Sequence, residues 1–251
     1  MERKLVIVKV GTTLPSIAAR RGDFEDWVLA GMGLTPADVR IARPRRGEPW
    51  PQLQTIAGGV VPGSHAMVTD HEAWSERTAD WLRAVLAARI PVLGICYGHQ
   101  LLAYACGGEV ADNSNGREFG TVAAYLTPEG QADALLGNME NVLQVHASHK
   151  QSVVRLSTGA RVLASSAMDP HLAFAVGDRA WGVQFHPEFD ADVVSAYIRK
   201  EAVVLTAEEQ QPTHLVTTVR ETPYGRTILR RFAQLAMTFT TRVREEAPST
   251  L

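Results

Sequence analysis

The chain has 251 residues, and with 45% hydrophobic and 21% charged residues its composition is ordinary for a globular protein. The formal net charge of −2 gives no indication of a surface for nucleic acid or for an anionic membrane. The longest apolar runs fall far short of the roughly 18 residues that cross a bilayer, and the N-terminal segment lacks the apolar centre of a signal peptide. Two cysteines predict no disulfide framework, so we expect a cytoplasmic protein without membrane or nucleic-acid partners.

The first half of the chain alternates between strand-like and helix-like patterns. Apolar runs predict strands, and apolar residues at helical spacing predict helices. The expected strands are 4–10, 38–44, 55–61 and 90–95, and the expected helices are 17–33 and 72–89. Strands that alternate with crossover helices predict a mostly parallel sheet covered by helices on both faces.

From about Thr121 the pattern changes to short strands separated by turn residues, which predicts an appended antiparallel layer. These strands are expected at 121–126, 141–146, 152–157, 161–167, 172–176 and 180–185, followed by helices at 191–202 and 223–243. The predicted fold class is therefore α/β, with a mostly parallel central sheet flanked by helices and an added antiparallel strand layer. We expect one domain over 1–251, with a core over about 4–200 and a C-terminal helical extension over 201–251.

The segment Gly94–Gly98, GICYG, has the form glycine, any residue, nucleophile, any residue, glycine. In such an elbow the nucleophile lies on a strained turn between a strand and a helix, and the glycines allow close approach. The N-terminal end of the following helix stabilises a thiolate at Cys96, and the backbone N–H of Tyr97 could face a substrate oxyanion. The other cysteine, Cys106, lies at helical spacing with Leu102 and is interpreted as core filling.

A cysteine nucleophile needs an acid–base partner, usually a histidine oriented by a third group. His186 ends an apolar strand-like run in WGVQFHPEF, and Glu188 lies two residues further on, where its carboxylate could bond one ring nitrogen. The spacing of His146 and His149 could suit a metal, but no further ligand cluster supports that interpretation. His65, His71, His171 and His214 are interpreted as structural.

Together, GICYGHQ and FHPEF, about ninety residues apart, resemble the class I glutamine amidotransferases, and in particular stand-alone relatives of the amidotransferase half of GMP synthetase. The resemblance covers about residues 4–197 and implies a flavodoxin-like amidotransferase fold. It also implies a catalytic triad of Cys96, His186 and Glu188.

The same resemblance implies further substrate-binding residues. Gln100 matches the position that holds the substrate glutamine, and ASHKQSV suggests Ser148 and Gln151 for the amino-acid end of the substrate. The family commonly has a Gly-Gly-Pro loop after its third strand, whereas this chain has VPGSHAMV there. Gly63 and Ser64 are therefore expected to supply the second oxyanion donor, while the earlier AGG at 57–59 is expected within the strand.

The implied reaction is hydrolysis of the γ-amide of glutamine through a γ-glutamyl thioester, which releases glutamate and ammonia without a metal or an organic cofactor. The ammonia would pass to a separate synthetase, because the chain has no Gly-rich phosphate loop of the pyrophosphatase type. Two alternatives stay open: a γ-glutamyl peptidase that acts on γ-glutamyl amides or peptides, and a catalytically silent binding module. An intact set of Cys, His and Glu argues against the silent module.

Overall fold

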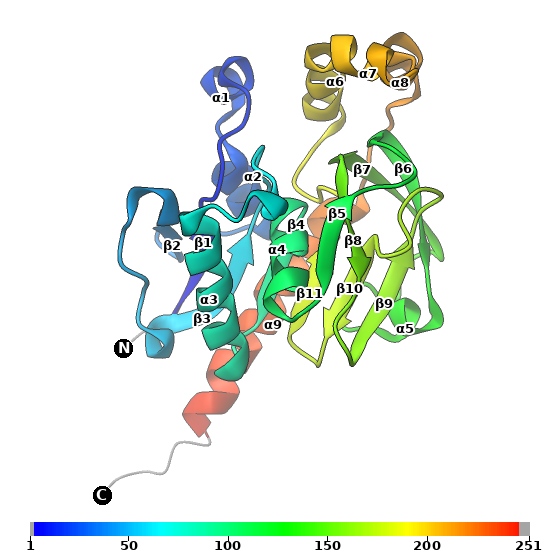
Figure 1. Ribbon diagram of the computed structural model, residues 1–251. Coiled ribbons are helices and arrows are strands. Elements are labelled where there is room, and N and C mark those ends of the chain that lie inside the picture. Colours follow the sequence, from blue (N-terminus) through cyan, green and yellow to red (C-terminus); the bar gives the residue numbers. More distant parts are fainter. Residues whose placement is uncertain (1–2, 246–251) are drawn as a thin grey trace, which may run out of the picture.

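The computed structural model describes residues 3–245, which form a nine-stranded sheet, a separate two-stranded sheet and helices on both sides of the large sheet (Figure 1). The large sheet has the strand order β2-β1-β3-β4-β11-β10-β9-β6-β7. Its parallel part comprises β1 (Lys4–Val8), β2 (Val39–Ala42), β3 (Ile56–Val61), β4 (Val92–Ile95) and β11 (Ala180–Val183). Because parallel strands end at one edge, this sheet gathers the loops after β3, β4 and β11 at the same place.

The rest of the large sheet is antiparallel, which confirms the predicted combination of a parallel sheet with antiparallel strands. Its strands are β6 (Glu118–Leu126), β7 (Val142–His149), β9 (Ala160–Ser165) and β10 (Ala173–Val176). The small sheet pairs β5 (Glu109–Asp112) with β8 (Gln151–Arg155). The sequence pattern did not indicate β5, which has four residues and no fully buried side chain.

Alternate residues of β1 belong to two hydrophobic clusters on opposite faces of the sheet. Leu5 and Ile7 pack with α2 (Phe24–Met32) and α9 (Tyr224–Glu245). Val6 and Val8 pack with α3 (Ala73–Ala87) and α4 (Tyr97–Ala105), which lie in front of the sheet in Figure 1, while α9 runs behind it. The helices thus cover both faces, as expected for a parallel sheet.

The expected helix over 17–33 is wrong in one respect, because the chain forms two helices there: α1 (Pro15–Arg21) and α2. Gly22 has a φ of 77°, which ends α1. Asp23 is extended and caps α2, with Asp26 bonding back to its backbone N–H. This capping box gives α2 its own start, and Gly33 ends it in a left-handed conformation.

The C-terminal part also differs in detail from the prediction. The helix expected over 191–202 is split into α6 (Ala191–Lys200) and α7 (Ala202–Ala207), and the sequence pattern did not indicate α8 (Pro212–Thr218). These three helices lie together at the top of the molecule in Figure 1, and the five-residue α5 (Pro128–Ala132) lies beside β9 and β6. The division of the predicted domain into a core that ends at about residue 200 and a C-terminal extension stays a prediction. The outer bounds of that domain, 1 and 251, lie outside the described residues. Among residues 3–245, no helix has the length and hydropathy needed to span a membrane.

Candidate active site

Cys96 lies at the turn between β4 and α4 with φ 50° and ψ −102°, a conformation that non-glycine residues rarely adopt. Both flanking glycines are required by close backbone contacts. A Cβ on Gly98 would lie 1.9 Å from the carbonyl oxygen of Val61, and a Cβ on Gly94 would lie 2.3 Å from that of Gly98. The sequence motif therefore forms a strained elbow with the thiol at its tip, as expected.

Helix α4 begins directly after the sulfur-bearing residue. Its first residue, Tyr97, has no intrahelical acceptor for its N–H, and the positive end of the helix dipole lies beside Cys96. The Tyr97 hydroxyl is bonded to Ser75 in the core, so its backbone is the group available to a substrate. The Cys96 Sγ lies 3.8 Å from the carbonyl oxygen of Ser148 at the end of β7.

His186 and Glu188 follow β11, the strand that pairs with β4. The His186 Nδ1 lies 2.7 Å from Glu188 Oε1, and Cys96 acts electrostatically on the same imidazole. Burial by itself would lower the pKa of His186, but the negative charges of Glu188 and Cys96 together raise it well above its usual value. Phe189 stacks on the ring at 4.0 Å between centroids and helps to fix its orientation. The structure thus brings all three predicted triad residues together.

The loop after β3 carries Gly63 and Ser64, from which the second oxyanion donor is expected. Gly63 lies against the imidazole, since a Cβ at this position would be 3.0 Å from His186 Cε1. The Ser64 hydroxyl donates to the carbonyl oxygen of Val10 at 3.1 Å and accepts from Ala66 N–H at 3.2 Å, which holds the loop in place. The AGG segment lies within β3, as expected, so the loop at 62–64 is the part that faces the site.

A pocket of about 230 Å³ opens beside Cys96. Ser64, Tyr97, Gln100, Ser148 and Gln151, all predicted from the sequence, line it. The amide nitrogen of Gln100 donates to the Gln151 carbonyl oxygen at 2.8 Å, so these two residues connect α4 to the start of β8. The structure therefore brings these predicted residues together around the pocket beside the nucleophile, whereas Gly63 does not line it.

Three partners that hold these residues were not predicted. Gln184 accepts a second hydrogen bond from the Gln100 amide at 3.0 Å. The Gln151 amide nitrogen donates to Thr69 and to Asp112 of β5, which ties this side chain to both residues. Both glutamine side chains are thus fixed by the protein itself and are ordered before a substrate binds.

The backbone near Lys150, which the sequence also suggested, lines the pocket as well. Sequence reasoning missed the other lining residues, which are His65, Met67, Arg117, Phe119, His149, Tyr197 and Glu201. Tyr197 and Glu201 come from α6 and its end, and the Tyr197 hydroxyl is 2.7 Å from that of Thr13. His65 stacks on Tyr197, so it belongs to the pocket although it was interpreted as structural. His149 bonds Glu118 and the Gln151 carbonyl oxygen, both at 3.0 Å. The sequence offered no local signal for these residues, because tertiary folding alone brings them together.

Comparison with known proteins agrees with this geometry. The family model described as glutamine amidotransferase class-I matches residues 39–204. The chain is 38% identical over 136 residues to the glutamine-hydrolyzing GMP synthase of Aeropyrum pernix, covering 54% of this chain and 25% of the relative. It is 32% identical over 194 residues to that of Bordetella parapertussis, covering 75% of this chain and 34% of the relative. The chain thus spans only about a quarter to a third of these relatives.

Solved structures share the fold. A glutamine amidotransferase from Thermotoga maritima superposes with a TM-score of 0.73 at 20% identity, covering 94% of this chain and 99% of the other. A glutamine amidotransferase from Methylobacillus flagellatus gives a TM-score of 0.65 at 24% identity, covering 98% and 95%. Because the family model matches well over half of the chain, and because the fold agrees, this protein belongs to the class-I glutamine amidotransferase family.

Proposed function

We propose that Cys96, His186 and Glu188 act as a triad that hydrolyses the γ-amide of glutamine to glutamate and ammonia. The observation that carries this proposal is the buried His186, whose Nδ1 bonds Glu188 and whose pKa is raised, against the effect of burial, by Glu188 and Cys96. A histidine raised in pKa between a carboxylate and a thiol favours an imidazolium–thiolate pair, which is the reactive form of such a nucleophile.

In this mechanism the Cys96 sulfur adds to the side-chain carbonyl carbon of glutamine. The N–H of Tyr97 and an N–H of the Gly63–Ser64 loop stabilise the oxyanion, and each such donor contributes about 3–4 kcal/mol in comparable enzymes. The imidazolium of His186 protonates the departing amine, and a γ-glutamyl thioester remains. Neutral His186 then takes a proton from water, which attacks the thioester and releases glutamate.

The surroundings of His186 favour ammonia over a bulky amine as the leaving group. The ring is 4% exposed, Phe189 covers it, and Gly63 lies against its edge. Neither His186 nor Glu188 lines the pocket beside Cys96. Because little space is open on the side where the amine departs, glutamine suits the site better than γ-glutamyl amides with large amine parts.

We further propose that a separate synthetase uses the ammonia. This proposal is supported by the curated relatives, which are glutamine-hydrolyzing GMP synthases. Hydrolysis and nitrogen transfer would then be divided between this chain and a partner that carries the acceptor site.

The test is release of glutamate and ammonia from glutamine by wild-type protein and by the Cys96→Ala variant, with Cys106→Ala as the matched control. We expect Cys96→Ala to lose about 10³-fold or more in kcat, because the covalent step is gone. Cys106→Ala should keep its rate, since this thiol is a partly buried residue of the core cluster around α3 and α4. A Cys96→Ala protein that hydrolyses glutamine at the wild-type rate would contradict the proposed role of Cys96 as the nucleophile.

A further inference from the structure

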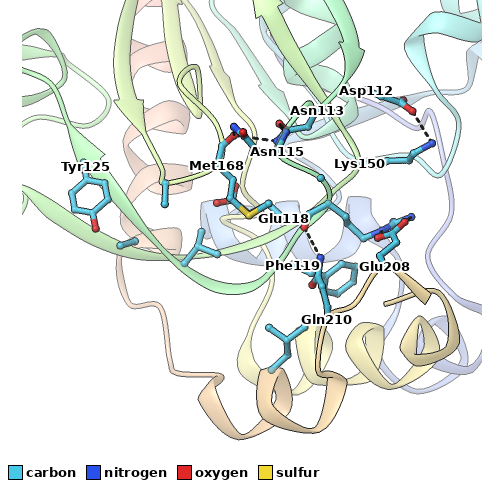
Figure 2. A pocket seen from close by; sticks show the side chains of 16 residues that line it. Asp112, Asn113, Asn115, Glu118, Phe119, Tyr125, Lys150, Met168, Glu208 and Gln210 are labelled. Atoms are coloured by element: carbon cyan, nitrogen blue, oxygen red, sulfur yellow. Dashed lines mark hydrogen bonds and ion pairs between the residues drawn. The ribbon is translucent and has the colours of Figure 1, made fainter. Parts of the chain in front are cut away.

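A second and larger pocket, of about 630 Å³, adjoins the pocket beside Cys96 (Figure 2). The two share Arg117, Phe119 and Lys150 in their walls, so they are neighbours with a common boundary. Sites that hold small molecules usually measure about 300–1,000 Å³. The second pocket lies in that range, and the hydrolysis of free glutamine does not require it.

Two ion pairs frame the boundary between the pockets. Lys150 Nζ lies 2.8 Å from Asp112 Oδ2, and Arg117 Nε lies 3.0 Å from Glu208 Oε2. Both cations line both pockets, whereas both carboxylates line only the second pocket. We call these two ion pairs the frame. A part of a substrate that extends from the catalytic pocket into the second pocket meets the hydrogen-bond donors Lys150 and Arg117 first and the acceptors Asp112 and Glu208 next.

The boundary lies at the amino-acid end of the catalytic pocket. Lys150 belongs to the 148–151 segment that we expect to hold this end of glutamine, while His186, on the leaving-group side, lines neither pocket. Glu201, which suits an α-ammonium group, lines the catalytic pocket but not the second one. The α-amino end is thus directed toward Glu201, and the α-carboxyl end toward the frame.

The chemistry of the frame suits a peptide link better than a free carboxylate. The carbonyl of an α-amide accepts from Lys150 or Arg117, and its N–H donates to Asp112 or Glu208. A free α-carboxylate offers no donor to those two acceptors. Beyond the frame, the wall is mainly apolar, with Val122, Met168 and Leu215, although Asn113, Asn115 and Gln210 also line the pocket. Figure 2 shows Tyr125 at the far end from the Asp112–Lys150 pair.

We propose that the second pocket binds the residue that follows glutamine in an α-linked peptide, so that the substrate is a peptide with N-terminal glutamine and an apolar second residue. This inference rests on the proposed function. The reaction is deamidation: Cys96 displaces the side-chain amine as ammonia, with a proton from His186, and water then cleaves the thioester. The N-terminal glutamine becomes glutamate, and the peptide bond is kept.

The test compares four compounds: glutamine, glutaminyl-phenylalanine, N-acetylglutamine and γ-glutamyl-phenylalanine. Ammonia release is measured for the first three and phenylalanine release for the last. We expect kcat/KM for glutaminyl-phenylalanine to exceed that for glutamine about tenfold or more, because the phenyl ring is buried on binding. A comparable gain for N-acetylglutamine or γ-glutamyl-phenylalanine instead would overturn the placement at the α-carboxyl end.

A pocket-filling variant links the gain to this pocket. Ala123 lines the second pocket only, and Ala123→Trp should abolish the gain while glutamine hydrolysis stays within about twofold of wild type. Ala160→Trp, on β9 outside the two linings, is the matched control and should keep the gain. If Ala123→Trp does not fold, Leu215→Trp fills the pocket from α8. A gain that survives in the folded pocket-filling variant overturns the proposal.

Protection of Cys96 from iodoacetamide, followed by mass spectrometry of its peptide, separates this inference from the proposed function. If no compound is hydrolysed but glutaminyl-phenylalanine protects Cys96 better than glutamine does, the pocket assignment stands and the proposed hydrolysis fails. If glutamine is hydrolysed while glutaminyl-phenylalanine neither reacts faster nor protects better, the pocket assignment fails alone. If no compound is hydrolysed or protects, both fail.

Discussion

The pKa of His186 is decided by opposing effects at a single residue. Burial favours the neutral ring, whereas Glu188 and Cys96 favour the charged one, and the balance raises the pKa. Because both partners raise this pKa, removing either one lowers it and weakens the preference for the charged ring. Glu188, two residues after His186, therefore raises the pKa of the ring as well as fixing its orientation.

The pH profile of Glu188→Gln tests this balance. A raised pKa keeps His186 protonated to higher pH, so the alkaline limb of kcat/KM for glutamine should lie well above pH 6.5 in the wild type. Glu188→Gln removes a negative charge beside Nδ1, so the limb should shift to lower pH and kcat should fall about 10²–10⁴-fold. Glu188→Asp keeps the charge and should retain more of the alkaline activity. An alkaline limb at the same pH in Glu188→Gln and wild type would contradict the account.

At the scale of elements, the elbow depends on how closely α4 approaches β3. In Gly98→Ala the new Cβ would lie 1.9 Å from the Val61 carbonyl oxygen, and neither backbone can move without shifting α4. Gly31→Ala in α2 is the matched control, because the short contact of its Cβ would be with the Cδ1 atom at the end of the Leu229 side chain and not with backbone. Chemical denaturation should show a loss of about 2–4 kcal/mol for Gly98→Ala and much less for Gly31→Ala, where the better helix propensity of alanine offsets part of the cost. Equal losses would show that the approach of α4 to β3 is not what requires Gly98.

The elements that the sequence predicts best are those whose own residues decide their conformation. The apolar run at 90–95, the flanking glycines and the helical spacing after Cys96 place the nucleophile, and the run that ends at His186 places the base. The parallel pairing of β11 with β4 could not be predicted from the local sequence, because the residues of a short apolar strand do not identify the strand with which it pairs. The same holds for Tyr197, which lines the pocket from α6 and bonds through its hydroxyl to Thr13, far away in the chain.

Across the whole molecule, the C-terminal helix α9 is part of the packing behind the site. Ile228, Leu229 and Phe232 are fully buried in the cluster that contains Leu93 and Ile95 of β4, the strand that ends at Cys96. The amphipathic spacing predicted the helix, but a helical pattern alone does not say which face of the sheet it covers. The support for β4 therefore comes from both ends of the chain, from α2 and from α9.

Buried histidines predict how the stability of the whole molecule depends on pH. Burial lowers the pKa of both His99 and His146 to about 4, whereas an unfolded chain binds protons at these residues below about pH 6.5. The unfolded state therefore gains protons first as the pH falls, and each histidine costs the native state about 1.4 kcal/mol per pH unit between pH 6.5 and 4. The free energy of unfolding can be measured by urea titration at several pH values in this range. As the pH falls, it should decrease less steeply in His99→Gln than in wild type, by about 1.4 kcal/mol per pH unit. His214→Gln, exposed on α8, should keep the wild-type slope. If all three proteins show one slope, proton uptake at the buried His99 does not limit stability in acid.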